Sequence, residues 1–483
     1  MTVPRHPAIS ALLVVALAAA GCGEARRTYP GGSTLRATLV DRNRNGSLER
    51  APGEALLDRT DLASARRPVR TLATFAQITD VHVADEESPA RAPFLDRLGA
   101  PYNSSFRPQE ALQPHVLASA VATLDRLHPQ AVIETGDLID NDQRNELDQA
   151  LRVLRGGRVD PNSGSRRYTG VQNGRNPDAF YYRPDIDAPR HLGMLAAAER
   201  PFRSPGLRSP WYPVLGNHDF MVKGVLPPTP LTRRAAVGSQ RLDGLPRRTR
   251  VPDERNLTAT VIDKLVARAS ARLKSRVPAD RSRRQMGVAE VVAALRRASG
   301  HGGRGPRLDY TFDIGLRVRG IALDVLRRDS ARGQLRAGQL RWLREQLRAA
   351  GRRYVVVFSH EPLRKVDGGA SALGLLDEDP RVVAAVAGDT HRNEVEPRRT
   401  ARGGYWLVTT SSLIDFPQQA RAFRLVQTAD GGAALETWLL DHGPGPRGLA
   451  SVSRELAFLD SQGGRPARFS GNRLDRNVRL FAP

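Results

Sequence analysis

The chain has 483 residues, of which 40% are hydrophobic and only 5% aromatic, and it carries a formal net charge of +23. At this length the size of the core is not limiting, and one large domain with insertions or several domains are both allowed. With 34 prolines and 43 glycines, the composition indicates a globular, loop-rich protein with an aliphatic core.

Arginine supplies nearly all of the positive charge. Lysine occurs only at Lys223, Lys264, Lys274 and Lys365, while arginines are spread through every segment. This distribution favours a generally basic, solvated surface over a dedicated polyanion site, and no specific nucleic-acid partner is expected. A positive field would still speed the approach of phosphorylated substrates or anionic envelope polymers.

Residues 1–22 have the pattern of a signal peptide. Arg5 precedes a continuous apolar run from Ile9 to Ala20, and Gly21-Cys22 follows. The run is too short to span a bilayer as a mature helix, and Cys22 is the only cysteine, so it has no disulfide partner. The segment resembles a bacterial lipoprotein signal, which implies export and a membrane anchor through lipidated Cys22 on the extracytoplasmic face; simple secretion is the alternative.

Residues 23–70 indicate a tether and an irregular lead-in. Within them, the segment from Asp41 to Gly46 repeats the first half of a calcium-binding loop. A twelve-residue loop would end on Pro52, where a glutamate is required, so the sequence favours an ordinary Asn/Gly turn.

From Leu72 onward, short apolar runs alternate with helical patterns, which predicts an α/β sheet protein with helices outside. The predicted helices span Pro108–Leu127, Asn145–Leu154 and Ala337–Ala349. The predicted strands are Leu72–Ile78, Ala131–Glu134, Trp211–Leu215, Tyr310–Ile314, Val318–Asp324, Tyr354–Phe358, Val382–Ala387, Tyr405–Thr410 and a pair near Phe423 and Trp438.

Residues 223–306 break this alternation. They are rich in arginine, have helical patterns at Thr258–Leu273 and Met286–Ala298, and lack a strand pattern, so they are interpreted as a helical insertion. The main domain is accordingly predicted over residues 71–445, with a C-terminal extension at 446–483. Residues 409–417 fit a strand and a turn beside the site described next.

Metal-ligand residue types follow five of the predicted strands. They are Asp80 and His82, Asp137, Asn217 with His218, His360, and Asp389 with His391. In an α/β sheet the carboxyl ends of strands meet in one crevice, so these residues are expected to converge. The mixture of Asp, His and Asn suits Mn, Fe, Zn or Mg, and it exceeds the needs of one ion. Two divalent ions sharing a carboxylate such as Asp137 could activate a water and clamp a phosphoryl group.

The ordered blocks Asp-x-His, Gly-Asp-x-x-Asp, Gly-Asn-His-Asp, His and Gly-x-x-His resemble the calcineurin-like metallophosphoesterase superfamily over residues 75–440. The resemblance implies a four-layer sandwich of two mixed sheets flanked by helices. It also implies that Asp80, His82 and His391 hold one ion, that Asp137 bridges, and that Asn217 and His360 hold the other. His218, oriented by Asp140, would contact the phosphate or protonate the leaving group.

One block departs from the family pattern. Asp389 occupies the position where the family usually has a histidine that binds the second ion. A carboxylate can also ligate, and it would shift the preference of the second site from Zn toward Mn or Fe. The alternative is that Asp389 does not reach the ion and the second site is weak.

The sequence therefore predicts an exported, dimetal-dependent enzyme that hydrolyses phosphate mono- or diesters through a metal-activated water. Its substrate would be a phosphate-ester small molecule or an envelope phosphate polymer. The alternative is a catalytically weak or inert binding protein of the cell envelope with the same fold, which would be expected to lack several of the ligands; only one position differs here.

Overall fold

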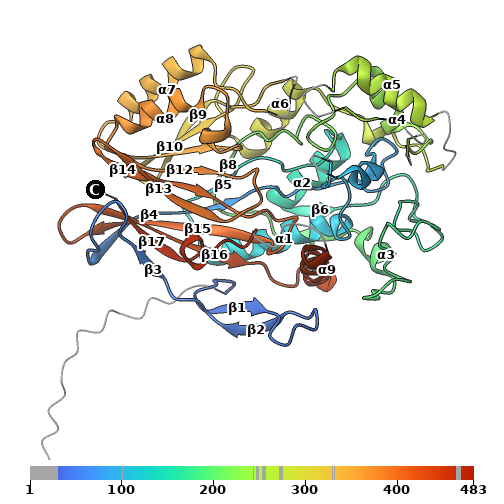
Figure 1. Cartoon of the computed structure of the whole chain (residues 1–483), viewed down its shortest axis with the longest axis horizontal. Helices are drawn as coiled ribbons and strands as arrows, with labels where there is room; N and C mark the ends of the chain where they lie inside the picture. The colour runs from blue at the N-terminus through green and yellow to red at the C-terminus, as the bar shows by residue number, and fades with distance from the viewer. Residues whose placement is uncertain are drawn as a thin grey trace, which may run out of the picture.

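The computed structural model describes residues 31–99, 102–242, 244–245, 250–252, 257–270, 276–328, 330, 332–463 and 469–482. Cys22 and the rest of residues 1–22 lie outside these ranges. Two large mixed sheets stacked face to face form the body of the molecule (Figure 1).

The first sheet has six strands and a parallel centre. Its four middle strands pair in parallel, with helices in two of the connections between them and an edge strand in the third, and its two edge strands pair antiparallel with their neighbours. In spatial order the strands are β13 (Glu394–Thr400), β14 (Gly403–Thr409), β12 (Val382–Ala387), β11 (Tyr354–Ser359), β10 (Val318–Leu323) and β9 (Tyr310–Ile314).

The second sheet has seven strands. Three neighbours, β4, β5 and β8, run parallel, and the central pairs that β15 and β16 make are antiparallel. The spatial order is β3 (Leu57–Arg59), β17 (Val478–Ala482), β16 (Ala433–Asp441), β15 (Gln419–Thr428), β4 (Pro68–Ile78), β5 (Ala131–Glu134) and β8 (Trp211–Pro213).

Aromatic and aliphatic side chains fill the space between the sheets. Phe75 on β4 stacks on Phe423 of β15, with ring centroids 4.7 Å apart, and meets Phe358 of β11 edge-on at 6.0 Å. Side chains alternate along a strand, so Val356 and Phe358 face the other sheet, whereas Val355 and Val357 belong to the core under the helices.

Helices cover both outer faces and complete the four layers. Helices α7 (Ala337–Ala349) and α8 (Gly369–Asp377) pack on the six-stranded sheet. Helix α1 (Gln113–Leu127) lies along the seven-stranded sheet, with α2 (Arg144–Arg155) and α9 (Leu449–Gly463) beside it (Figure 1). The predicted fold, a four-layer α/β sandwich, is confirmed. None of the described helices is both long and apolar enough to cross a membrane.

The seven-stranded sheet reaches beyond residues 71–445 at both ends. Strand β3 from the predicted lead-in lies at one edge of the sheet and pairs in parallel with β17 from the predicted C-terminal extension. Before them, β1 (Ala37–Val40) and β2 (Glu49–Pro52) form a separate hairpin. In its loop the Asp41 carboxylate accepts the backbone N–H groups of Asn45 at 3.1 Å and Gly46 at 3.0 Å, as expected for a turn.

The insertion is helical, as predicted. Its described residues form α4 (Pro230–Val237), α5 (Ala259–Ser270) and α6 (Val288–Ser299), with isolated bridges but no strand. Helices α4 and α5 lie at one end of the sandwich (Figure 1). The fully buried Arg283 joins the insertion to the loop after β4, because its Nε donates to Asp85 at 2.9 Å.

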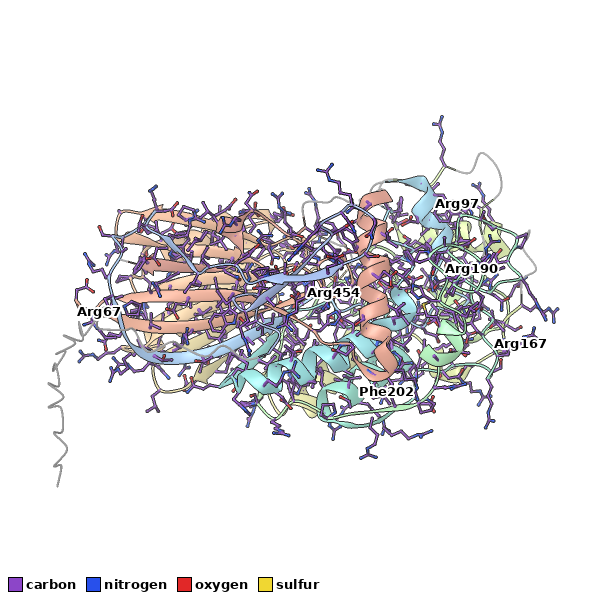
Figure 2. All side chains as sticks on the ribbon, turned by 90° about the horizontal axis from the view of Figure 1, so that it is seen from below. Arg67, Arg97, Arg167, Arg190, Phe202 and Arg454 are labelled. Carbon is purple, nitrogen blue, oxygen red and sulfur yellow. The ribbon has the colours of Figure 1, made fainter. Side chains whose placement is uncertain are left out.

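Arginines lie at both ends of the molecule. Arg67 is at one end, Arg97, Arg167 and Arg190 are at the other, and Arg454 is on α9 (Figure 2). This distribution agrees with the generally basic surface inferred from the sequence.

Candidate metal centre

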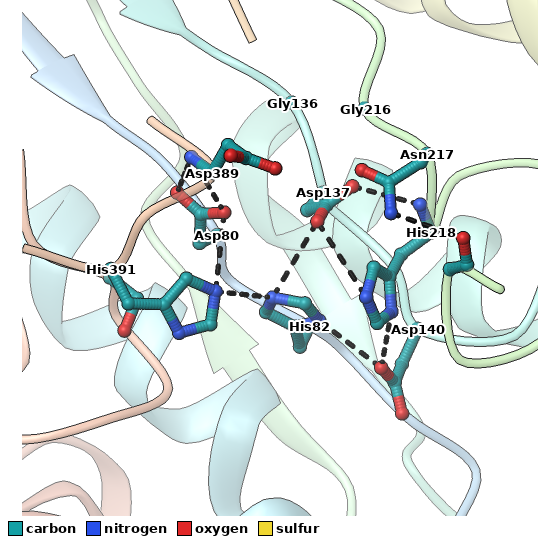
Figure 3. A network of polar contacts seen from close by, with 12 residues as sticks. Asp80, His82, Gly136, Asp137, Asp140, Gly216, Asn217, His218, Asp389 and His391 are labelled. Atoms are coloured by element: carbon teal, nitrogen blue, oxygen red, sulfur yellow. Dashed lines mark hydrogen bonds and ion pairs between the residues drawn. The ribbon is translucent and has the colours of Figure 1, made fainter. Parts of the chain in front are cut away.

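The carboxyl ends of five strands converge on one site. Asp80 and His82 follow β4, Asp137 follows β5, and Asn217 with His218 follows β8, three parallel neighbours in one sheet. The remaining residues, His360, Asp389 and His391, follow β11 and β12, parallel neighbours in the other sheet. The structure brings all of the predicted ligands together, His360 through its contacts with Asp137, Asn217 and Asp389. Figure 3 shows the others, with His218 and Asp140 at their edge.

The backbone of the site is held in an unusual conformation. Five of the predicted ligands have positive φ angles between 52° and 66°, namely Asp80, His82, Asp137, Asp389 and His391. Such angles are unfavourable for residues with a side chain, and they concentrate where function requires a particular side-chain direction. Gly136 permits the close packing, since a Cβ there would lie 2.6 Å from His360 Nδ1.

Asp80, His82 and His391 form what we call the first half of the cluster. The Nε2 atoms of His82 and His391 are 3.3 Å apart, and His391 Nε2 is 3.3 Å from Asp80 Oδ1. Asp137 lies next to them, with its Oδ2 3.8 Å from His82 Nε2 (Figure 3).

The tautomers of these two histidines follow from their other ring nitrogens. His82 Nδ1 lies 3.1 Å from Asp140 Oδ1, and His391 Nδ1 lies 2.6 Å from Asp415 Oδ2. An ionised carboxylate only accepts hydrogen bonds, so each Nδ1 carries a proton and each Nε2 of a neutral ring presents a lone pair. A proton on His391 Nε2 would join it to His82 Nε2 at 3.3 Å, and a divalent cation that replaces this proton could be bound by both nitrogens.

Asn217, His360 and Asp389 form the second half. His360 Nδ1 donates to the Thr135 carbonyl at 2.8 Å, so its Nε2 faces Asn217 Oδ1 at 3.1 Å and Asp389 Oδ1 at 3.8 Å. Asp137 Oδ2 is 3.3 Å from the same nitrogen and therefore reaches both halves. This position suits a bridging carboxylate.

The electrostatic field at the cluster favours positive charge. Burial lowers the pKa of His360, but the carboxylates of Asp137, Asp80 and Asp389 outweigh it and raise that pKa well above its usual range. For His391, burial is likewise outweighed, mainly by Asp80 and Asp415, and the pKa rises to about 9. Divalent cations would satisfy this buried excess of carboxylate, so the donor set fits two ions.

His218 stands beside the cluster with one nitrogen held and the other facing inward. Its Nδ1 is 2.9 Å from Asp140 Oδ1, and its Nε2 is 3.9 Å from Asp137 Oδ2. Burial opposes ionisation of Asp140, but the Lys223 ammonium and hydrogen bonds from His218 and His82 hold its pKa well below the usual range. His218 is thereby placed to donate a proton toward the centre.

Several buried residues that support the ligands were not singled out from the sequence. Arg107 pairs with Asp415 through two hydrogen bonds, of 2.7 Å and 3.1 Å, and so fixes the carboxylate that orients His391. The Asp219 carboxylate accepts the backbone N–H groups of Gly216 and Asp137, at 2.8 Å and 3.2 Å. Asp219 could have been found from its place in the Gly-Asn-His-Asp block, and Asp415 from the turn predicted beside the site.

Comparisons with known proteins give only distant similarities. Neither a protein-family model nor a curated protein matches the chain. Among solved structures, a dimetal phosphatase from Danio rerio is 14% identical with a TM-score of 0.39, and the alignment covers 77% of this chain and 100% of that one.

Two further structures match over part of their length. A purple acid phosphatase from yellow lupin is 10% identical with a TM-score of 0.34, over 76% of this chain and 51% of that one. A sulfate thiohydrolase, SoxB, from Thermus thermophilus is 13% identical with a TM-score of 0.32, over 82% and 61%. These scores are low, so the case for a function rests on the geometry of the site. The two-sheet architecture and the converged ligands agree with the resemblance to calcineurin-like metallophosphoesterases.

Proposed function

We propose that the chain hydrolyses phosphate mono- or diesters with two divalent metal ions held by this cluster, with Mn, Fe or Zn as the expected metals. One observation carries the proposal: three histidines have Nδ1 held by an acceptor and turn Nε2 into the cluster, where those of His82 and His360 face Asp137 and that of His391 faces Asp80. When bound, the ions would supply a nucleophilic water and neutralise charge on the phosphoryl oxygens.

Each residue of the cluster would have a particular role. Asp80, His82 and His391 would hold one ion, Asn217, His360 and Asp389 the other, and Asp137 would bridge them. The His218 ring, held through Nδ1 by Asp140 at 2.9 Å, presents Nε2 for proton transfer to a leaving oxygen. Solvent reaches the cluster beside Asp389, whose side chain is 30% exposed, whereas Asp80 and His360 are fully buried.

The test is turnover by the full chain in detergent, stripped of metal and reloaded with Mn, Fe or Zn, on p-nitrophenyl phosphate and bis-p-nitrophenyl phosphate. We expect hydrolysis of at least one of these esters, and we expect His218→Ala to reduce turnover of phenyl phosphate, whose leaving group needs a proton, by about 10²–10⁴-fold, the usual contribution of a general acid. Asp160→Ala serves as the matched control, because Asp160 is exposed and lies in a loop far along the chain from the ligands. Turnover absent with every metal would support the inert binding protein instead, and equal turnover of phenyl phosphate in wild type and His218→Ala would remove His218 as the acid.

We further propose that the protein acts outside the cytoplasm, anchored by a lipid on Cys22, where a phosphate-ester small molecule or an envelope phosphate polymer is the substrate. The apolar run before Cys22 and the absence of any second cysteine support this location. Metabolic labelling with a radioactive fatty acid tests it: the wild-type chain is expected to take up label and Cys22→Ser is not. Equal labelling of the two would contradict the anchor.

A further inference from the structure

Lys223 lies at the centre of a chain of buried charges that begins at the metal site. Its ammonium contacts Asp140 Oδ2 and is 3.5 Å from Glu110 Oε2, and Glu110 in turn pairs with Arg91. Negative and positive charges alternate along this chain, and all four side chains are at most 3% exposed. A buried charge is stable only when it is paired, so each member fixes the position of the next.

The backbone at Lys223 and Gly224 also contacts residues of the site. Lys223 has a φ of 51°, unfavourable for a residue with a side chain, and its N–H donates to the Asp140 carbonyl at 3.0 Å. The next residue, Gly224, packs so closely on His218 that a Cβ would lie 2.2 Å from its Cδ2. The turn at Lys223 and Gly224 therefore contacts Asp140 through a backbone N–H and a side chain, and it also packs against the His218 ring.

The presence of a lysine rather than an arginine at position 223 is informative in this chain. Arginine outnumbers lysine overwhelmingly, and the structure buries arginines elsewhere, such as Arg91 and Arg283. An ammonium is a compact point charge, whereas a guanidinium is a broad planar fork. Only the compact group suits a position between two carboxylates with Gly224 and His218 packed alongside.

We propose that Lys223 is a positioning residue for His218, the acid of the proposed phosphoesterase reaction, and the role rests on that proposed function. Lys223 holds Asp140 Oδ2, which leaves Oδ1 to accept from His218 Nδ1 and aims Nε2 at the leaving group. In the step concerned, a water oxygen forms a new P–O bond and releases its proton to solvent. The ester P–O bond breaks, and its electron pair stays on the leaving oxygen, which takes the proton from His218 Nε2 and departs as an alcohol.

The experiment compares two leaving groups in Lys223→Met, made in the full chain and loaded with metal. Phenolate needs a proton to leave, whereas p-nitrophenolate leaves readily without one. With metal added until both sites are filled, turnover of phenyl phosphate is therefore expected to fall by about 10²-fold and that of p-nitrophenyl phosphate by less than about tenfold. Lys264→Met is the matched control, because Lys264 is exposed on α5, and both of its rates should equal those of wild type.

With both metal sites filled, equal losses on the two esters, or no loss at all, would each overturn the role of Lys223. If Lys223→Met does not unfold cooperatively, the same comparison is made with Asp140→Asn, which keeps the side-chain shape and removes the charge that Lys223 holds. A uniform loss there also overturns the proposal. Wild-type protein that hydrolyses neither ester overturns the proposed function together with this role, whereas wild-type turnover with a uniform loss in the variants overturns the role alone.

Discussion

The two halves of the metal cluster are supported in different ways. In the first half, His82 and His391 are oriented by carboxylates, and each carboxylate is paired with a buried cation: Asp140 with Lys223, and Asp415 with Arg107. In the second half, backbone carbonyls orient the ligands. His360 donates to the Thr135 carbonyl at 2.8 Å, and Asn217 Nδ2 donates to that of Gly224 at 3.2 Å.

This difference determines which substitutions should weaken metal binding. A carboxylate that orients a histidine can be removed by one substitution, and supporting groups of this kind typically contribute about 10–100-fold in metal affinity. A backbone carbonyl survives any side-chain change at its residue. The first half should therefore be sensitive to residues remote in sequence, and the second half should depend mainly on its ligands.

The largest effect on turnover is expected from a substitution of Asp137, which lies between the two halves. Asp137→Ala removes the one carboxylate that reaches both, so turnover should fall by about 10³-fold, equivalent to about 4 kcal/mol of charge stabilisation. Binding of both ions should weaken together in titration calorimetry. Loss of only one ion would show that Asp137 does not bridge.

Asp415→Asn should weaken metal binding in the first half of the cluster and leave metal binding in the second half unchanged. The amide cannot replace a carboxylate paired with Arg107, so His391 loses its fixed orientation and affinity for the first ion should fall by about 10–100-fold. Affinity for the second ion should stay the same. Calorimetry on the metal-free chain measures both constants, and an equal decrease in the two would remove the distinction between the halves.

Asp389→Asn addresses the departure from the family pattern and should have a smaller effect. Asp389 Oδ1 is 3.8 Å from His360 Nε2 and its side chain is 30% exposed, so solvent can partly replace it. Affinity for the second ion should fall by less than about tenfold while that for the first is kept, as for an exposed charged contact. Metal analysis of the purified variant checks this, and unchanged affinity at both sites would exclude Asp389 from the ligand set.

Thr135→Val should change metal binding least. The substitution keeps the carbonyl that orients His360 and removes only the hydroxyl that accepts from Gln77 at 2.8 Å. Stability should decrease by about 1 kcal/mol, the usual value of one buried hydrogen bond, with both metal affinities unchanged. Chemical denaturation and calorimetry measure the two quantities, and a weakened second ion would mean that the side chain itself supports His360.

The sequence predicted the apolar strands well and missed strands without an apolar signal. Ala131–Glu134 and Val382–Ala387 match the structure, are buried throughout and appear as continuous apolar runs. Strand β13, with Pro397 and two arginines, has no such signal because it lies at an edge. Strands β3 and β17 form through their partners, which lie more than 400 residues apart in the chain.

The same reasoning explains what could be inferred about the site. Each predicted ligand directly follows an apolar strand, so the order of the motifs was enough to expect convergence. Arg107, Lys223 and Asp415 lie in loops, and their contacts with the ligands depend on how those loops pack in three dimensions. A local pattern contains no information about such packing, and only the structure showed the two buried ion pairs behind the first half.

The central claim is that this cluster binds two divalent ions and uses them together to hydrolyse phosphate esters. The most direct test is to titrate the metal-free full chain with Mn while following both bound metal and turnover of p-nitrophenyl phosphate. We predict that binding saturates at two ions per chain and that turnover rises with the second equivalent. Saturation at one ion, or full turnover without added metal, would contradict the claim.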